Sequence, residues 1–150
     1  LALASVAAMQ GRIAVAHLLG DALKPLRSHL LASNIFTSPE IASVGLSADA
    51  AKGAGRDVET ATYPLGGNGR SIIRGTTGSV TLVRAKDGPV LGVHMVGLGV
   101  SELISEAQLA VGWEAHPEDI APLVHAHPSQ GEAFGEAAML AAGRPLHAHA

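Results

Sequence analysis

The sequence contains no cysteine, and only four of its 150 residues are aromatic: Phe36, Tyr63, Trp113 and Phe134. Without cysteine, the chain itself can form no disulfide, no thiolate metal site and no cysteine nucleophile. The absence agrees with a cytoplasmic location. Because 47% of the residues are nevertheless apolar, the core must be built from Ala, Val, Leu and Ile.

The chain also lacks a basic block and a long apolar run. The formal net charge is −3, and so few aromatic residues offer little for bases to stack on, so we expect no nucleic-acid partner. No apolar run reaches the roughly 18 residues that a membrane span needs. The apolar start has no basic region before it and is interrupted at residues 10–12, which does not fit a signal peptide.

Periodicity divides the chain into a leading helix and a mixed domain. Residues 3–19 are rich in alanine with apolar residues at near-helical spacing, and Gly20 is a plausible C-cap. A packed helix at the edge of a chain indicates that it belongs to something larger. Residues 21–32, with Pro25 among them, are typical of a linker.

Short β-like runs and further helices follow. The Asp-Gly connection between the last two expected strands is a strong hairpin signal, and a proline at 117 suits the start of a helix. The pattern predicts an α+β fold, with an antiparallel sheet and helices packed on one face. The expected strands are 41–45, 58–63, 79–84 and 90–96, and the expected helices are 48–53, 102–111, a short one from Pro117 and 130–142.

The segment 125–132, His-Ala-His-Pro-Ser-Gln-Gly-Glu, contains the strongest candidate for chemistry. Glu132 could hold one ring nitrogen of His127 protonated and leave the other free to accept a proton near neutral pH. However, Ser129-x-x-Glu132 also matches a capping box, and the spacing alone favours capping. In addition, His125-x-His127 could contribute two ligands to a zinc site, but the sequence identifies no third ligand.

Two glycine clusters invite a nucleotide-binding interpretation that their details do not support. Gly97-Leu98-Gly99 lacks the third glycine of a dinucleotide fingerprint, because Glu102 stands there, and a tight turn is favoured. The cluster at 66–69 lacks the Lys-Ser/Thr of a phosphate loop. We expect a flexible turn at 66–69.

Five segments, in order along nearly the whole chain, resemble the flavin-dependent pyridine nucleotide-disulfide oxidoreductases, and most of all the dihydrolipoyl dehydrogenases. Segment 124–138 is similar to their C-terminal His-Ala-His-Pro-x-x-x-Glu signature, and 35–47 to their Thr-x-Pro-Glu-(Ile/Val)-Ala-x-Val-Gly stretch. The others are LASVAAMQGRIAVAHLLG (3–20), YPLGGNGR (63–70) and PVLGVHMVGLGVSELISEAQLA (89–110).

The resemblance implies a domain division, cofactors and partners. Residues 1–32 would be the last helix of an FAD domain plus a linker, and 33–150 the dimerisation (interface) domain of a homodimer. FAD and NAD would be bound mainly by domains that this chain does not contain, and the substrate would be a small-molecule or lipoyl-group dithiol. We expect no turnover from this chain alone.

The resemblance also implies roles for individual residues. His127 would be the general base and Glu132 its partner, acting in the active site of the other subunit, although one carboxylate is not expected to serve both His127 and the helix cap fully. The backbone of Leu3, Ala4 and Ser5 would meet the flavin ring, and His125 would lie near the flavin across the dimer. No metal site is expected.

Two alternatives remain open. Relatives on the same scaffold reduce quinones or other disulfides, and the residues that separate these activities would lie upstream. In the second alternative the chain is a non-catalytic dimerisation module, with the apolar faces of 102–111 and 133–142 available for a two-fold interface.

Overall fold

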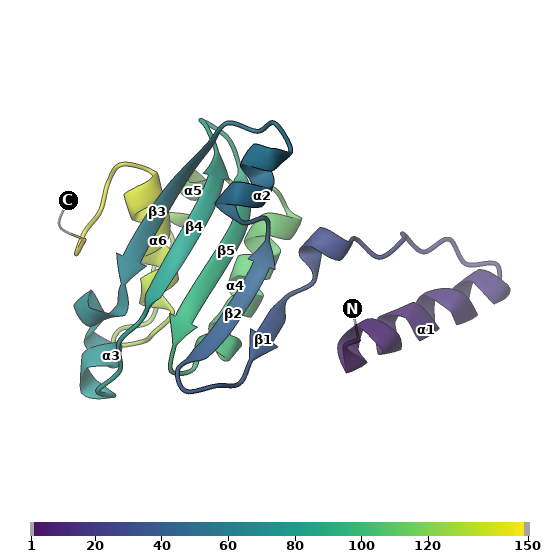
Figure 1. Ribbon diagram of the computed structural model, residues 1–150, viewed down its shortest axis with the longest axis horizontal. Coiled ribbons are helices and arrows are strands. Elements are labelled where there is room, and N and C mark those ends of the chain that lie inside the picture. Colours follow the sequence, from purple (N-terminus) through teal and green to yellow (C-terminus); the bar gives the residue numbers. More distant parts are fainter. Residues whose placement is uncertain (1, 149–150) are drawn as a thin grey trace.

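The computed structural model describes residues 2–148 and is organised around one five-stranded antiparallel sheet (Figure 1). The order across the sheet is β1-β2-β5-β4-β3, so β5, the last strand in the sequence, lies in the middle. The strands are β1 (Ser33–Ile35), β2 (Glu40–Gly45), β3 (Val58–Pro64), β4 (Ser79–Ala85) and β5 (Val90–Gly97).

Three helices cover one face of the sheet, behind the strands in Figure 1. This confirms the expected α+β architecture. They are α4 (Val100–Gly112), α5 (Pro117–Ile120) and α6 (Glu132–Ala141). The remaining helices are α1 (Ala4–Leu18), α2 (Ala48–Gly53) and α3 (Gly69–Ile73), with short 3₁₀ turns at Ser28–Leu30 and Leu65–Gly67.

The core lies between the sheet and these helices. Alternate strand residues such as Val44, Leu82 and Val93 point toward the helices and are fully buried. Facing them, α6 presents mostly alanine, with Phe134 as the one buried phenylalanine, and α4 presents alanine together with valine and isoleucine. Small side chains let the helices approach the sheet closely, which explains how a core with so few aromatic residues is filled.

The apolar faces of 102–111 and 133–142 are therefore not available for a dimer interface, and that expectation is wrong. Ile104 and Ala107 of α4 and Ala137 of α6 are buried within the domain. Large apolar side chains that remain exposed in α4 or close to the ends of α4 and α5 include Leu109, Trp113, Leu123 and Val124.

Several local predictions are confirmed residue by residue. Helix α2 has the expected bounds, and the Ser47 side chain caps it by accepting from the Ala50 N–H. Strands β4 and β5 form the expected hairpin, with Asp87 in the left-handed conformation at φ 52°. Pro117 is the first residue of α5.

The glycine cluster at 66–69 contains the expected turn, as a 3₁₀ turn, and also the start of a helix that was not expected. Asn68 ends the 3₁₀ turn and is the N-cap of α3, and its side chain is buried at 3% exposure. Strand β1 was also not expected, because three residues at the edge of the sheet are too few to show alternation.

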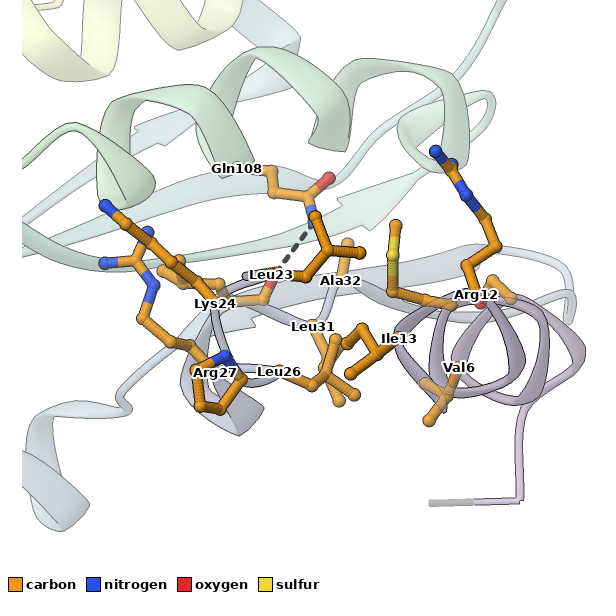
Figure 2. A pocket seen from close by; sticks show the side chains of 14 residues that line it. Val6, Arg12, Ile13, Leu23, Lys24, Leu26, Arg27, Leu31, Ala32 and Gln108 are labelled. Carbon is orange, nitrogen blue, oxygen red and sulfur yellow. Dashed lines mark hydrogen bonds between the residues drawn. The ribbon is translucent and has the colours of Figure 1, made fainter. Parts of the chain in front are cut away.

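In Figure 1 helix α1 stands apart from the sheet, whereas the end of the linker reaches the domain, with Leu30 and Ala32 packed against the core. Val6 is the only buried residue of this helix, whereas Val15, Leu18 and Leu19 are exposed. Figure 2 shows a pocket in which Val6 and Ile13 of α1 lie near linker residues, below Gln108 of α4. Gln108 donates a hydrogen bond of 2.7 Å to the carbonyl of Leu30, which connects the linker to the domain.

Candidate active site at the His-Pro loop

The loop before α6 places His127 and Glu132 in direct contact. The Nδ1 atom of His127 lies 2.8 Å from Oε1 of Glu132. The imidazole is 76% exposed, while the glutamate side chain is only 22% exposed. An imidazole whose Nδ1 donates to a carboxylate carries its basic lone pair on Nε2, so the exposed edge of this ring is suited to accept a proton.

Glu132 binds two partners at once, one with each oxygen, although one carboxylate was not expected to serve both fully. Its Oε2 accepts from the backbone N–H of Ser129 at 2.8 Å, while Oε1 binds His127. Burial alone would raise the pKa of Glu132, but the hydrogen bonds from Ser129 and His127 hold that pKa below its ordinary value of 4.5. The carboxylate is thus ionised at neutral pH. The dyad is compatible with one half of the expected capping box: Glu132 binds the Ser129 N–H, but the N-cap of α6 is Gly131 and no side chain caps this helix.

Side chains distant in sequence hold the rest of this loop. The sequence motifs did not indicate these contacts. The buried Asn68 donates from Nδ2 to the carbonyl of Ser129 at 2.9 Å. Gln130 donates from Nε2 to the carbonyl of Leu98 at 2.9 Å and also contacts the Arg74 guanidinium. Asparagine is a preferred N-cap residue, so Asn68 could have indicated the helix at 69–73.

His125 is paired separately from His127. Its Nε2 lies 2.8 Å from Oε1 of Glu106 on α4. Its ring packs on α6 at Gly135, where a Cβ would come within 2.7 Å of Nδ1. The two histidines of the His-x-His segment thus bind different glutamates. Among residues 2–148, no three side chains of metal-ligating type form a cluster.

A third histidine–glutamate pair lies one turn further along α6. Nδ1 of His147 is 2.6 Å from Oε1 of Glu136, and the His147 N–H donates to Oε2 of the same carboxylate at 3.1 Å. Together these two bonds fold the chain after α6 back onto this helix. His149, the other histidine of the tail, lies outside the described residues.

Leu3, Ala4 and Ser5 form the start of α1. Leu3 is the N-cap residue, with an extended backbone at φ −117° and ψ 138°. Within the described chain, the first turn has neither an acidic residue nor a side-chain cap. Its N–H groups and the positive end of the helix dipole are thus available to an electronegative partner. The structure does not bring these residues to His127: they are on the helix that stands apart from the sheet (Figure 1).

The comparison with protein families gives one match over most of the chain. Residues 31–138 match the family described as pyridine nucleotide-disulphide oxidoreductase, dimerisation domain. The chain belongs to this family. Among curated relatives, it is 42% identical over 149 residues to a dihydrolipoyl dehydrogenase of Bacillus subtilis and 37% identical over 148 residues to that of Geobacillus stearothermophilus. These alignments cover 98% and 97% of the chain.

Solved structures agree with this assignment. The chain superposes on LpdA from Mycobacterium tuberculosis with a TM-score of 0.88 at 35% identity, over 93% of this chain. It shares the fold of the flavoprotein disulfide reductase RclA from Escherichia coli, with a TM-score of 0.78 at 20% identity over 86% of this chain. The chain therefore carries the dimerisation domain of a dihydrolipoyl dehydrogenase-like flavin disulfide oxidoreductase.

The chain covers only part of the length of these relatives. It spans 31% of the length of the Bacillus and Geobacillus enzymes and 31% of the Mycobacterium chain, and 30% of RclA. In this family the domain forms the homodimer. Among residues 2–148, no helix combines the length and the apolar character needed to cross a bilayer.

Proposed function

We propose that this chain forms the homodimer of an NAD-dependent dihydrolipoyl dehydrogenase and supplies His127 and Glu132 to the active site of the partner subunit. The observation that carries the proposal is the 2.8 Å contact between His127 Nδ1 and Glu132 Oε1, with the opposite edge of the ring exposed. A site that a second subunit completes requires an imidazole that is both oriented and exposed, as this one is.

The proposed chemistry is proton transfer from a dithiol. A thiol has a pKa near 8.5, and the thiolate is the nucleophile in disulfide exchange. Nε2 of His127 would take the proton of a dihydrolipoyl thiol as the thiol sulfur attacks a cysteine disulfide, which forms a mixed disulfide and releases the other cysteine as a thiolate. The Glu132 carboxylate would then stabilise the imidazolium. The redox disulfide cannot come from this chain, which has no cysteine.

In this proposal, the start of α1 contacts the flavin of its own subunit, and His125 lies near the flavin of the partner subunit. The uncapped N–H groups of Leu3, Ala4 and Ser5 suit the electronegative edge of the ring, where the helix dipole favours negative charge. His125, held by Glu106, would approach the flavin of the partner subunit. When bound, FAD would be the electron acceptor for a reduced cysteine pair, with NAD as the final acceptor.

A chimera tests this proposal. Residues 1–150 would replace the matching 31% of the Bacillus subtilis enzyme, and dihydrolipoamide oxidation would be measured for the chimera and for its His127→Gln variant. General acid–base catalysis contributes about 10²–10⁴-fold, so we expect a loss of that order with flavin content and dimer mass unchanged. His29→Gln, the same change at an exposed position, is the control.

The alternatives predict different outcomes. A chimera that reduces quinones but not lipoamide would favour the sibling activity. Full activity of the His127→Gln chimera would overturn the catalytic role of His127. It would support the alternative in which the domain is only a dimerisation module. Activity of the 150-residue chain by itself would contradict the proposal that two subunits and the further domains are required.

A further inference from the structure

The orientation of His127 depends on the loop that carries it. Because the ring is 76% exposed, packing does little to fix it. Glu132 binds Nδ1, but Glu132 in turn binds the N–H of Ser129. Ser129 is therefore the backbone position on which the geometry of the pair depends.

The peptide groups of Ser129 are held from both sides. Its N–H donates to Oε2 of Glu132 at 2.8 Å, and its carbonyl accepts from Nδ2 of Asn68 at 2.9 Å. Asn68 precedes Ser129 by 61 positions in the sequence. Only this contact ties the carbonyl of Ser129 to α3 among the described residues.

Asn68 is itself fixed by its second function. Its Oδ1 accepts from both the backbone N–H and the hydroxyl of Ser71, each at 2.9 Å. These bonds make Asn68 the N-cap of α3 and leave its Nδ2 aimed at the loop. With 3% exposure, the amide has both ends satisfied inside the protein, which makes its direction well defined.

The next residue along the chain lies beside the imidazole. A Cβ on Gly69 would stand 4.0 Å from Cε1 of His127. Gln130 strengthens the same junction, since its buried side chain reaches Ser71 and the carbonyl of Leu98. The start of α3 and the His-Pro loop therefore form one packed unit.

We propose that Asn68 is a positioning residue for His127: by fixing the carbonyl of Ser129, it places the loop so that Glu132 reaches Nδ1 of the imidazole. The catalytic consequence rests on the proposed function, whereas the positioning itself does not. The alternative is that Asn68 only caps α3, and that the His-Pro loop keeps its conformation without the bond from Asn68 to Ser129.

The first test separates the cap from the tether in the 150-residue chain. Serine is a good N-cap but is too short to reach Ser129, so Asn68→Ser keeps α3 and removes the tether. Asn68→Asp is a second variant, of the same size and with a capping oxygen but, when ionised, no N–H donor. Asn34→Ser, which changes the only other asparagine of the chain, is the matched control.

The readouts are the tautomer of the neutral His127 ring, from ¹⁵N shifts of its nitrogens, and hydrogen exchange of backbone amides. Unchanged protein and the Asn34→Ser control should show Nδ1–H as the main tautomer. Both Asn68 variants should shift His127 toward Nε2–H and speed exchange at the Ser129 amide about tenfold or more, with the Ser71 amide still protected. An unchanged tautomer and Ser129 exchange rate in both variants would overturn the proposal.

A second test connects positioning to activity in the Bacillus chimera. Misplacement of a catalytic group by about 1 Å can cost about a hundredfold, so Asn68→Ser should lower kcat by roughly ten- to a hundredfold with KM unchanged. Added to His127→Gln it should have no further effect. If His127→Gln itself leaves activity intact, the proposed function fails, while the tautomer measurement still decides the role of Asn68.

Discussion

The imidazole of His125 lies directly against the backbone of Gly135. A Cβ at position 135 would come within 2.7 Å of Nδ1 and 2.8 Å of Cε1 of this ring. The absence of a side chain there lets His125 lie on α6 while its Nε2 reaches Glu106 on α4 at 2.8 Å. One glycine thus allows a histidine to join two helices.

Gly135→Ala should therefore displace His125. Overpacking costs about 1–3 kcal/mol, whereas alanine in a helix gains about 1 kcal/mol over glycine, so the free energy of unfolding should fall by up to about 2 kcal/mol. Urea denaturation measures the free energy of unfolding, and the ¹⁵N shift of His125 Nε2 reports the loss of its hydrogen bond with Glu106.

Gly11→Ala is the matched control for that change. Position 11 lies inside α1, and a Cβ there would find no atom within 4 Å. Such a change stabilises by about 0.4–1 kcal/mol. Equal effects of the two substitutions would show that His125 does not depend on Gly135.

Glu132→Gln tests whether one carboxylate serves two donors. Ser129 and His127 bind different oxygens of Glu132, and in glutamine an NH₂ donor replaces one of these two oxygens. We expect one of the two bonds to be lost, with about 1 kcal/mol less stability and a change in either Ser129 exchange or the His127 tautomer. Glu102→Gln removes a glutamate from the first turn of α4 and controls for the helix dipole. If both bonds persisted in Glu132→Gln, the shared geometry would be wrong.

The carboxylate of Glu118 should make the stability of the chain depend on pH. Hydrogen bonds from the buried Arg84, the nearer at 2.8 Å, hold the pKa of Glu118 below its ordinary value of 4.5. A carboxyl group with a lowered folded-state pKa contributes stability above pH 4.5, and that stability is lost as the pH falls through the folded pKa.

Glu118→Gln should therefore be less stable than the unchanged chain at pH 7, with a difference that shrinks below pH 4.5. Urea unfolding at a series of pH values measures it. Glu59→Gln, an exposed glutamate on β3, should show a smaller difference at pH 7. A Glu118 difference that stays constant down to pH 3 would contradict the account.

The sequence predicted well what depends on neighbours along the chain. Helix α2 and the β4–β5 hairpin follow from a serine cap and an Asp-Gly turn. The fold class followed from short strands succeeded by helices. The domain boundary at residue 32 and the roles of His127, Glu132, His125 and residues 3–5 rest on resemblance, and they stay predictions.

What the sequence did not predict depends on residues far apart. Asn68 meets Ser129, and His125 meets Glu106, only after the sheet brings their elements together. The helix at 69–73 was hidden because glycine has a low helix propensity, which the buried cap of Asn68 outweighs. Hydrophobic periodicity identified the apolar faces of α4 and α6 but not whether the sheet or a second subunit covers them.

The central claim, that His127 acts in the site of the other subunit, is tested most directly with mixed dimers of the Bacillus chimera. One subunit would carry His127→Gln, and the other would keep His127 but lack the redox cysteines of the Bacillus portion. Neither homodimer should oxidise dihydrolipoamide. The mixed dimer should regain one working site and about half the activity of the unchanged dimer, as expected for a shared interface. A mixed dimer as inactive as its parents, with flavin bound and the dimer intact, would contradict the account.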